Sequence, residues 1–340
     1  MSRAVVSTLL ASALFASVSL PMTAARATDP VPFRSADMLP TDSPSVQGVK
    51  RMGEIIRERS GRHLSIDSLG ADNKDSETYT INQVKNGQID MARLNVAVLS
   101  SALPEVNVLS LPYLFRSRQE MRHALDGPIG RELLEKMESG GLIGLCFYDM
   151  GARGFYSRKP IRSAADMKGL LVQIPTSEAA VDTVRALGAQ PVPMPFARVK
   201  AALESRAIDA AENTLAGYFG GRHYRAAPYF AATRHSWAPG VVVFSKAVWD
   251  TLTPQDHLII RDAARTSAAY VSSQLDAYEA MAIEKARQAG AEIVDVDVGS
   301  FEAALSSVGS DLLTNADLKK FADRIRPPSI ANMPDQQPAK

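Results

Sequence analysis

The sequence lacks the residue groupings on which catalysis usually depends. It contains no GxSxG, no HExxH, no GxGxxG opening a helix and no GxxxxGK[ST] phosphate loop. No two of its five histidines have helical metal-ligand spacing, and the single cysteine lies apart from them. We therefore expect a protein that is not an enzyme and has no metal site or cofactor. The polar residues at predicted strand ends then become candidates for binding a ligand.

Two asparagines end strands that follow similar segments. Residues 86–90 close a predicted helix and open a strand leading to Asn95, and residues 205–209 lead to Asn213 in the same way. Ligands of open α/β sheets lie beyond the carboxyl ends of strands. Two lobes that face each other would bring both asparagines to one cleft; a chance match of two short segments is the alternative.

Four further residues are candidates for the same cleft. Asp37 ends the first predicted strand and would favour a ligand with an amine or several hydroxyls, unless it is a solvated loop acid. Arg93 lies on a predicted strand, where a solvated arginine is the alternative. Trp237 could stack on a sugar or an aromatic ring, or could belong to the core. Tyr218 could also reach the cleft.

Strands and helices alternate along the chain, which predicts an α/β fold. Apolar residues recur at helical spacing in segments that end at glycine or beside it, while the intervening runs are typical of strands. The expected helices are 46–56, 76–86, 121–137, 177–187 and 196–203, and the expected strands are 63–69, 89–96, 142–148, 170–174, 191–193, 233–237 and 241–244.

One helix is expected to be unusually long. Thr253-Pro254-Gln255-Asp256 combines a cap, a first-turn proline and an acid at the third position. No residue breaks the pattern before Gly290, so the helix spans about 35 residues and about 50 Å. It could brace two lobes. Two helices joined by a kink near Ser272 are the alternative.

The charge balance excludes whole classes of partner. The 340 residues include 38 Lys and Arg against 37 Asp and Glu, a net charge of +1. Such a chain attracts neither nucleic acid nor an acidic membrane through bulk charge. The length exceeds one typical domain of roughly 100–200 residues, so two lobes are expected.

The first 27 residues have the pattern of a secretory signal. A basic start at Arg3 precedes an apolar run over residues 4–20, and Ala25-Arg26-Ala27 fits a cleavage site. We expect cleavage and a periplasmic mature chain, with an uncleaved anchor helix as the alternative. Cys146 cannot form an intramolecular disulfide and is expected to be a buried structural thiol.

The order of short motifs along the mature chain resembles one transport family. The motifs include Ser68-Leu69-Gly70, Lys85-Asn86-Gly87, Leu111-Pro112-Tyr113-Leu114-Phe115, Gly151-Ala152-Arg153-Gly154, Asp166-Met167-Lys168-Gly169, Leu187 to Met194, Asp209 to Asn213 and Leu252-Thr253-Pro254. This set is similar to the DctP-like solute receptors of tripartite ATP-independent periplasmic (TRAP) transporters. The resemblance implies a two-lobed periplasmic-binding-protein fold with a hinge and a long helix that crosses both lobes.

The resemblance also implies interleaved lobes and a set of partners. Lobe I would comprise 28–150 plus 239–278, lobe II would comprise 151–238 plus 279–325, and residues 326–340 would form a mobile tail. The receptor would capture a small polar solute, first of all an organic acid, and deliver it to the membrane subunits of a TRAP permease. We expect a monomer.

The chain departs from the family at one informative position. The family places an arginine that clamps the ligand carboxylate before a strand-ending proline, but here the segment reads Val172-Gln173-Ile174-Pro175. Gln173 has no charge and one NH2 group, whereas an arginine offers a charged, planar fork. We still expect Gln173 to line the pocket, with a polar residue that pairs with backbone as the alternative. Either the ligand is a neutral polyol, a sugar or an amine, or the carboxylate anchor lies elsewhere.

The resemblance suggests where that anchor could lie. Arg153 matches a second family arginine and is the first substitute, with a structural ion pair as its alternative, and Arg93 is the next. Asn213 matches the asparagine of the family's Glu-Asn pair, with a turn former as its alternative, and Phe196 matches a position that is often a pocket aromatic, with core packing as its alternative. A sensor-coupled receptor, a periplasmic enzyme and a binding protein of an ATP-driven transporter remain alternative functions.

Overall fold

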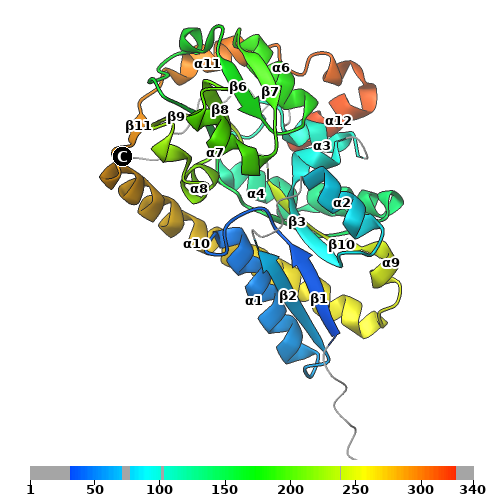
Figure 1. The fold of residues 1–340 in the computed structure, drawn as a ribbon. Coiled ribbons are helices and arrows are strands. Elements are labelled where there is room, and N and C mark those ends of the chain that lie inside the picture. The colour runs from blue at the N-terminus through cyan, green and yellow to red at the C-terminus, as the bar shows by residue number, and fades with distance from the viewer. Residues whose placement is uncertain (1–30, 71–76, 101–102, 238, 327–340) are drawn as a thin grey trace, which may run out of the picture.

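The computed structural model describes residues 31–70, 77–100, 103–237 and 239–326. The expected signal peptide and residues 327–340 of the expected tail lie outside these residues. Within them the chain forms two sheets with helices packed around each (Figure 1). Among the described helices, none is both long enough and apolar enough to cross a membrane.

The first sheet has the strand order β2-β1-β3-β10-β4. Its members are β1 (Val31–Ala36), β2 (Leu64–Gly70), β3 (Met91–Asn95), β4 (Leu142–Tyr148) and β10 (Gly240–Ser245). Strand β1 is parallel to β2 and β3, whereas β10 is antiparallel to β3 and β4. A late segment of the chain thus lies inside a sheet built mainly from early ones.

The second sheet has the order β11-β9-β5-β8-β6-β7. Its members are β5 (Arg153–Ser157), β6 (Leu171–Ile174), β7 (Gln190–Pro193), β8 (Ala210–Thr214), β9 (Tyr229–Ser236) and β11 (Glu292–Val294). Strand β5 runs antiparallel to β8 and β9, and β6 runs parallel to β7 and β8. The chain passes between the sheets after β4, after β9 and along the helix before β11.

Twelve α-helices are described, and they surround the two sheets. They are α1 (Pro44–Arg59), α2 (Glu77–Lys85), α3 (Glu105–Leu109), α4 (Arg118–Asp126), α5 (Pro128–Lys136), α6 (Glu178–Ala186), α7 (Phe196–Glu204), α8 (Leu215–Gly220), α9 (Lys246–Trp249), α10 (Pro254–Gln288), α11 (Val298–Leu305) and α12 (Ala316–Ile325).

Strands buried on both faces explain the long apolar runs in the sequence. In β10, Val241 and Val243 belong to one hydrophobic cluster, while Val242 and Phe244 belong to the cluster on the opposite face. Alternate residues of a strand point to opposite faces, so each face of this sheet has its own core. Strand β5 has the same arrangement in the second sheet, with Phe155 and Tyr156 in different clusters.

The long helix is confirmed as one continuous element. Helix α10 has 35 residues, and Thr253 and Asp256 form a capping box at its start. It packs on α1 and β4 of the first sheet and on α8 and β11 of the second (Figure 1). The alternative of two helices with a kink near Ser272 is therefore wrong.

One expected helix is two helices, and one expected cap does not form. The segment 121–137 lies in α4 and α5, which are separated at Gly127 because Pro128 occupies the first position of α5 and the residue before a proline avoids helical geometry. Ser177 precedes α6, but its side chain makes no capping hydrogen bond. Cys146 is buried, and burial raises the pKa of its thiol.

Candidate functional site

A cleft lies between the two sheets, beside the carboxyl ends of β3, β6 and β8. It encloses roughly 880 Å³, part of which is open to solvent. The first sheet and its connections contribute Met38, Leu39, Glu77, Thr78, Arg93, Asn95, Val98 and Met150. The second contributes Arg153, Gln173, Pro175, Thr176, Met194, Pro195, Phe196, Glu212, Asn213 and Thr214.

Arg153 and Glu212 form a buried ion pair on the wall made by the second sheet. Nε and Nη2 of Arg153 each donate to a carboxylate oxygen of Glu212, and the Nη2–Oε2 distance is 2.7 Å. His235 also approaches this carboxylate, with Nε2 3.3 Å from Oε1. Burial opposes ionisation of Glu212, but the charge and hydrogen bonds of Arg153 outweigh it and lower the pKa of Glu212 to about 2. Glu212 is therefore a carboxylate.

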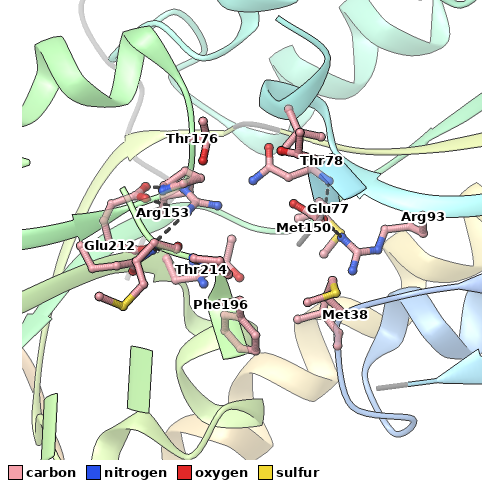
Figure 2. Close-up of a pocket in the computed structure, with 18 residues that line it drawn as sticks. Met38, Glu77, Thr78, Arg93, Met150, Arg153, Thr176, Phe196, Glu212 and Thr214 are labelled. Carbon is pink, nitrogen blue, oxygen red and sulfur yellow. Dashed lines mark hydrogen bonds and ion pairs between the residues drawn. The ribbon is translucent and has the colours of Figure 1, made fainter. Parts of the chain in front are cut away.

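This pairing leaves one edge of the Arg153 guanidinium available. Nη2 also donates to the Glu212 carbonyl oxygen at 3.3 Å. Nη1 has no hydrogen-bond partner among the described residues, and Arg153 lines the cleft (Figure 2). Both readings of Arg153 made from the sequence are thus compatible: the residue is ion-paired and still presents a donor to the cleft.

Arg93 forms a second buried charge cluster on the opposite wall, as Figure 2 shows for Arg93 and Glu77. Its Nε donates to Oδ2 of Asp37 at 2.8 Å, and its Nη2 donates to Oδ1. Nη1 lies 3.7 Å from Oε1 of Glu77. Arg93 is 4% exposed, so the solvated-arginine alternative is wrong. Burial lowers the pKa of Arg93, but the carboxylate of Asp37 outweighs that effect and keeps the guanidinium charged.

Gln173 lies at the cleft but does not replace the missing arginine. Its Nε2 donates to the carbonyl oxygen of Met194 at 3.0 Å. Its Oε1 is buried and has no hydrogen-bond partner among the described residues. One of its two N–H donors is therefore committed to the protein and the other is a single neutral donor, so Gln173 offers no charged two-donor clamp for a carboxylate.

The two asparagines lie at strand ends, as expected. Asn95 is the last residue of β3 and accepts a hydrogen bond from the backbone N–H of Ala97 at 3.0 Å. Asn213 lies on β8, and its Oδ1 accepts from the N–H of Thr214 at 2.8 Å. A Cβ at Gly217 would lie 2.6 Å from that oxygen, so glycine is needed where α8 packs against Asn213.

Apolar side chains form the rest of the cleft wall. Phe196 opens α7, lines the cleft and packs on His223 with a ring-centroid distance of 5.1 Å. Met38 and Met150 line the cleft from the side of the first sheet (Figure 2). Burial lowers the pKa of His223 to about 4, so this imidazole is neutral.

The structure does not bring three of the expected residues to the cleft. Asp37 is buried behind Arg93 and is not a lining residue. Tyr218 is fully buried, and its hydroxyl donates to the carbonyl oxygen of Ala227. Trp237 packs against the core of the first sheet, with Arg118 5.9 Å from its ring centroid.

Two lining carboxylates were not among the residues expected from the sequence. Glu77 begins α2, and its Oε1 accepts the backbone N–H of Asn95 at 2.9 Å. Glu212 lies on β8 between Ala211 and Asn213. A lone acid inside a short predicted strand was the available signal for Glu212. Within the parts of the chain that are described, no group of three His, Cys, Asp or Glu side chains could hold a metal ion.

Comparison with known proteins identifies the family. The family model for bacterial extracellular solute-binding proteins of family 7, DctP, matches residues 35–311. The chain belongs to this family. The DctP-family fold accounts for the two sheets, the cleft between them and the long helix.

Solved DctP-family structures closely resemble this chain. A TRAP periplasmic solute-binding protein of Bradyrhizobium sp. BTAi1, in complex with α/β-D-galacturonate, has 40% identity and a TM-score of 0.84, covering 87% of this chain and 99% of that one. The corresponding protein of Xanthobacter autotrophicus Py2, with bound β-D-galacturonate, has 39% identity and a TM-score of 0.83, covering 86% and 98%.

A curated relative agrees with these structures. The 2,3-diketo-L-gulonate-binding periplasmic protein YiaO of Escherichia coli K12 is 28% identical over 84% of this chain and 89% of its own length. The chain is a TRAP solute-binding protein, and the ligands of these relatives are organic acids.

Proposed function

We propose that this protein is the periplasmic receptor for a hexuronate such as D-galacturonate and delivers it to a TRAP permease. The observation that carries the proposal is the uncommitted Nη1 edge of Arg153 in a cleft that also holds amides, hydroxyls and apolar side chains. The two solved relatives with about 40% identity carry galacturonate. A hexuronate combines one carboxylate with several hydroxyls, which fits this mixture of groups.

Arg153 is the proposed carboxylate anchor, in preference to Arg93. Two donor atoms of Arg93 are bound to Asp37 and the third faces Glu77, so no edge of it is without a carboxylate. Arg153 has one edge left, and a charge-assisted hydrogen bond from it is about twice as strong as a neutral one. Asn213 and Asn95 would bind ring hydroxyls, and Phe196 would cover the ring.

The lobe boundaries and the targeting are part of the proposal. Lobe I is 28–150 plus 239–278, and lobe II is 151–238 plus 279–325. The membership of the two sheets supports this division for the strands, whereas α12 packs in the core of the first sheet and argues against placing residues 316–325 in lobe II. We propose cleavage after residue 27 and a monomeric receptor without enzymatic activity. Capture would then proceed by closure of the lobes about their connections.

A neutral polyol, a sugar or an amine is the second candidate ligand. It is favoured by Gln173, which offers no charge, and by the carboxylates of Glu77 and Glu212 at the cleft. Coupling to a sensor rather than a permease would use the same pocket.

A thermal-shift panel tests the proposed ligand class. D-galacturonate, D-glucuronate, D-galactose, D-galactitol and D-galactosamine would be added at 1 mM to the mature protein. A ligand at about 1,000 times its Kd stabilises by about 4 kcal/mol, so the uronate should raise the Tm by roughly 5 °C or more. A larger shift with galactitol or galactosamine than with either uronate would contradict the proposal.

A further inference from the structure

The described charges around the cleft do not balance. Two guanidinium groups, Arg93 and Arg153, face three carboxyl groups, Asp37, Glu77 and Glu212. No described lysine lines the cleft. With all five of these groups ionised, they have a net charge of −1 before any ligand enters; the imidazole of His235 also lies beside Glu212. A bound uronate would add a further negative charge to the same enclosed space.

Glu77 is the carboxyl group without a guanidinium of its own. Asp37 takes two donors of Arg93, and Glu212 takes two donors of Arg153. Glu77 is left with Nη1 of Arg93 at 3.7 Å, a distance too long for a hydrogen bond, and with the backbone N–H of Asn95. It is therefore the group that can be neutralised without breaking a paired carboxylate contact.

The charged groups that act on Glu77 come from both walls of the cleft. Helix α2 packs on β3, which contributes Arg93 and Asn95, and on β10, which contains no titratable residue. Asp37 follows β1, and Arg153 acts on Glu77 from the other wall. Burial raises the pKa of Glu77, while the charge of Arg93 and the N–H of Asn95 oppose the rise. A ligand carboxylate nearby would raise the pKa further.

We propose that the receptor binds its sugar acid together with one proton, which is held on the carboxyl group of Glu77. The proton comes from solvent and adds to a carboxylate oxygen of Glu77. Its positive charge cancels the negative charge that the ligand brings, so binding leaves the net charge of the cleft unchanged. A protonated carboxyl is also a hydrogen-bond donor, and could donate to an oxygen of the ligand. This inference rests on the proposed function, because it requires an anionic ligand.

Calorimetry with D-galacturonate between pH 5 and pH 9 tests the proposal. The sugar acid stays ionised throughout, so wild-type affinity should fall tenfold per pH unit between the pKa of Glu77 in the free protein and its higher pKa in the complex. Glu77→Gln, a neutral mimic of the protonated group, should bind with the same affinity across the range and at least tenfold more tightly than wild type at pH 9. Glu178→Gln removes an exposed carboxylate outside the cleft and should behave as wild type.

A second measurement needs no variant. Titrations of the wild-type protein in two buffers with different ionisation enthalpies give the number of protons taken up, which should approach one where affinity falls with pH. The inference would be overturned if the uronate bound tightly without proton uptake at any pH. It would also be overturned if Glu77→Gln bound the uronate tenfold more weakly at every pH. Either result would leave the uronate assignment standing. If no uronate binds at any pH, the assignment and the inference both fail.

Discussion

Arg153 binds Glu212 through one edge of its guanidinium, and its Nη1 remains without a partner among the described residues. The two residues lie on neighbouring strands, because β5 and β8 are antiparallel and pair Arg153 with Thr214 and Phe155 with Glu212. The pair is buried, with Arg153 7% and Glu212 5% exposed. Glu212 thus holds the guanidinium in place, and the proposed ligand carboxylate would bind at the remaining edge.

Replacing Arg153 with lysine should weaken uronate binding about 100-fold. Lysine keeps the charge but loses the planar fork, so it cannot bond to Glu212 along one edge and to a ligand along another. Titration calorimetry of Arg153→Lys with D-galacturonate measures the loss. Arg198→Lys, an exposed change on α7, is the control and should bind as wild type. Equal affinity of the two variants would refute the anchor.

Gln173 should matter much less than Arg153. Because one N–H of its NH2 group is bound to the Met194 carbonyl and the other is a single neutral donor, Gln173→Ala should reduce uronate affinity by less than about fivefold. Gln173→Arg adds a cation to an acidic cleft and should raise the affinity about tenfold. The same calorimetric assay applies, with Tm values checking that both variants fold. A Gln173→Ala defect as large as that of Arg153→Lys would show that the amide contacts the ligand directly.

Glu212 should make the fold sensitive to acid. Its pKa is lowered from 4.5 to about 2, so its contribution is fully present above pH 4.5 and is lost as the pH falls toward 2. A shift of that size corresponds to about 3 kcal/mol. Urea denaturation should show that Glu212→Gln has a lower free energy of unfolding than wild type at pH 6. Between pH 6 and pH 3 this free energy should fall less in the variant than in the wild type. An unchanged loss on acidification would contradict the ion-pair account.

The connection after β4 should not tolerate a side chain at Gly151. This residue has φ +81°, and an added Cβ would lie 2.3 Å from Oε1 of Glu279 on α10. Glu279 also binds Arg118 at 3.1 Å, so a displaced carboxylate disturbs that contact. Gly151→Ala should cost about 1–3 kcal/mol of unfolding free energy. Gly140→Ala, where a Cβ meets no atom within 4 Å, is the control and should unfold as wild type.

The elements of the fold could be predicted because their signals are local. The cap and proline before α10 lie within four residues of one another, and the continuous apolar runs of the central strands are equally local. The break between α4 and α5 had a local signal too, in Gly127-Pro128, but the apolar spacing on both sides concealed it.

The site could be predicted only in part, because it depends on contacts between distant segments. Arg93 and Asp37 are 56 residues apart and meet because β1 and β3 are adjacent. Glu77 lies beside Arg93, which Asp37 holds in place, so the residues next to Glu77 along the chain gave no sign that it lines the cleft. For Tyr218, the sequence did not show which side of α8 faces the core, and the structure places its ring there.

The most direct test of the account is a comparison of two sugars that differ in one group. D-galacturonate and D-galactose share their ring hydroxyls, but only the former has a carboxylate. Calorimetry of the wild-type protein at pH 6 should give D-galacturonate a Kd at least about 100-fold lower, since a charge-assisted contact to a buried guanidinium contributes about 2–3 kcal/mol. Equal affinities, or tighter binding of D-galactose, would contradict the claim that Arg153 makes this cleft a receptor for a sugar acid.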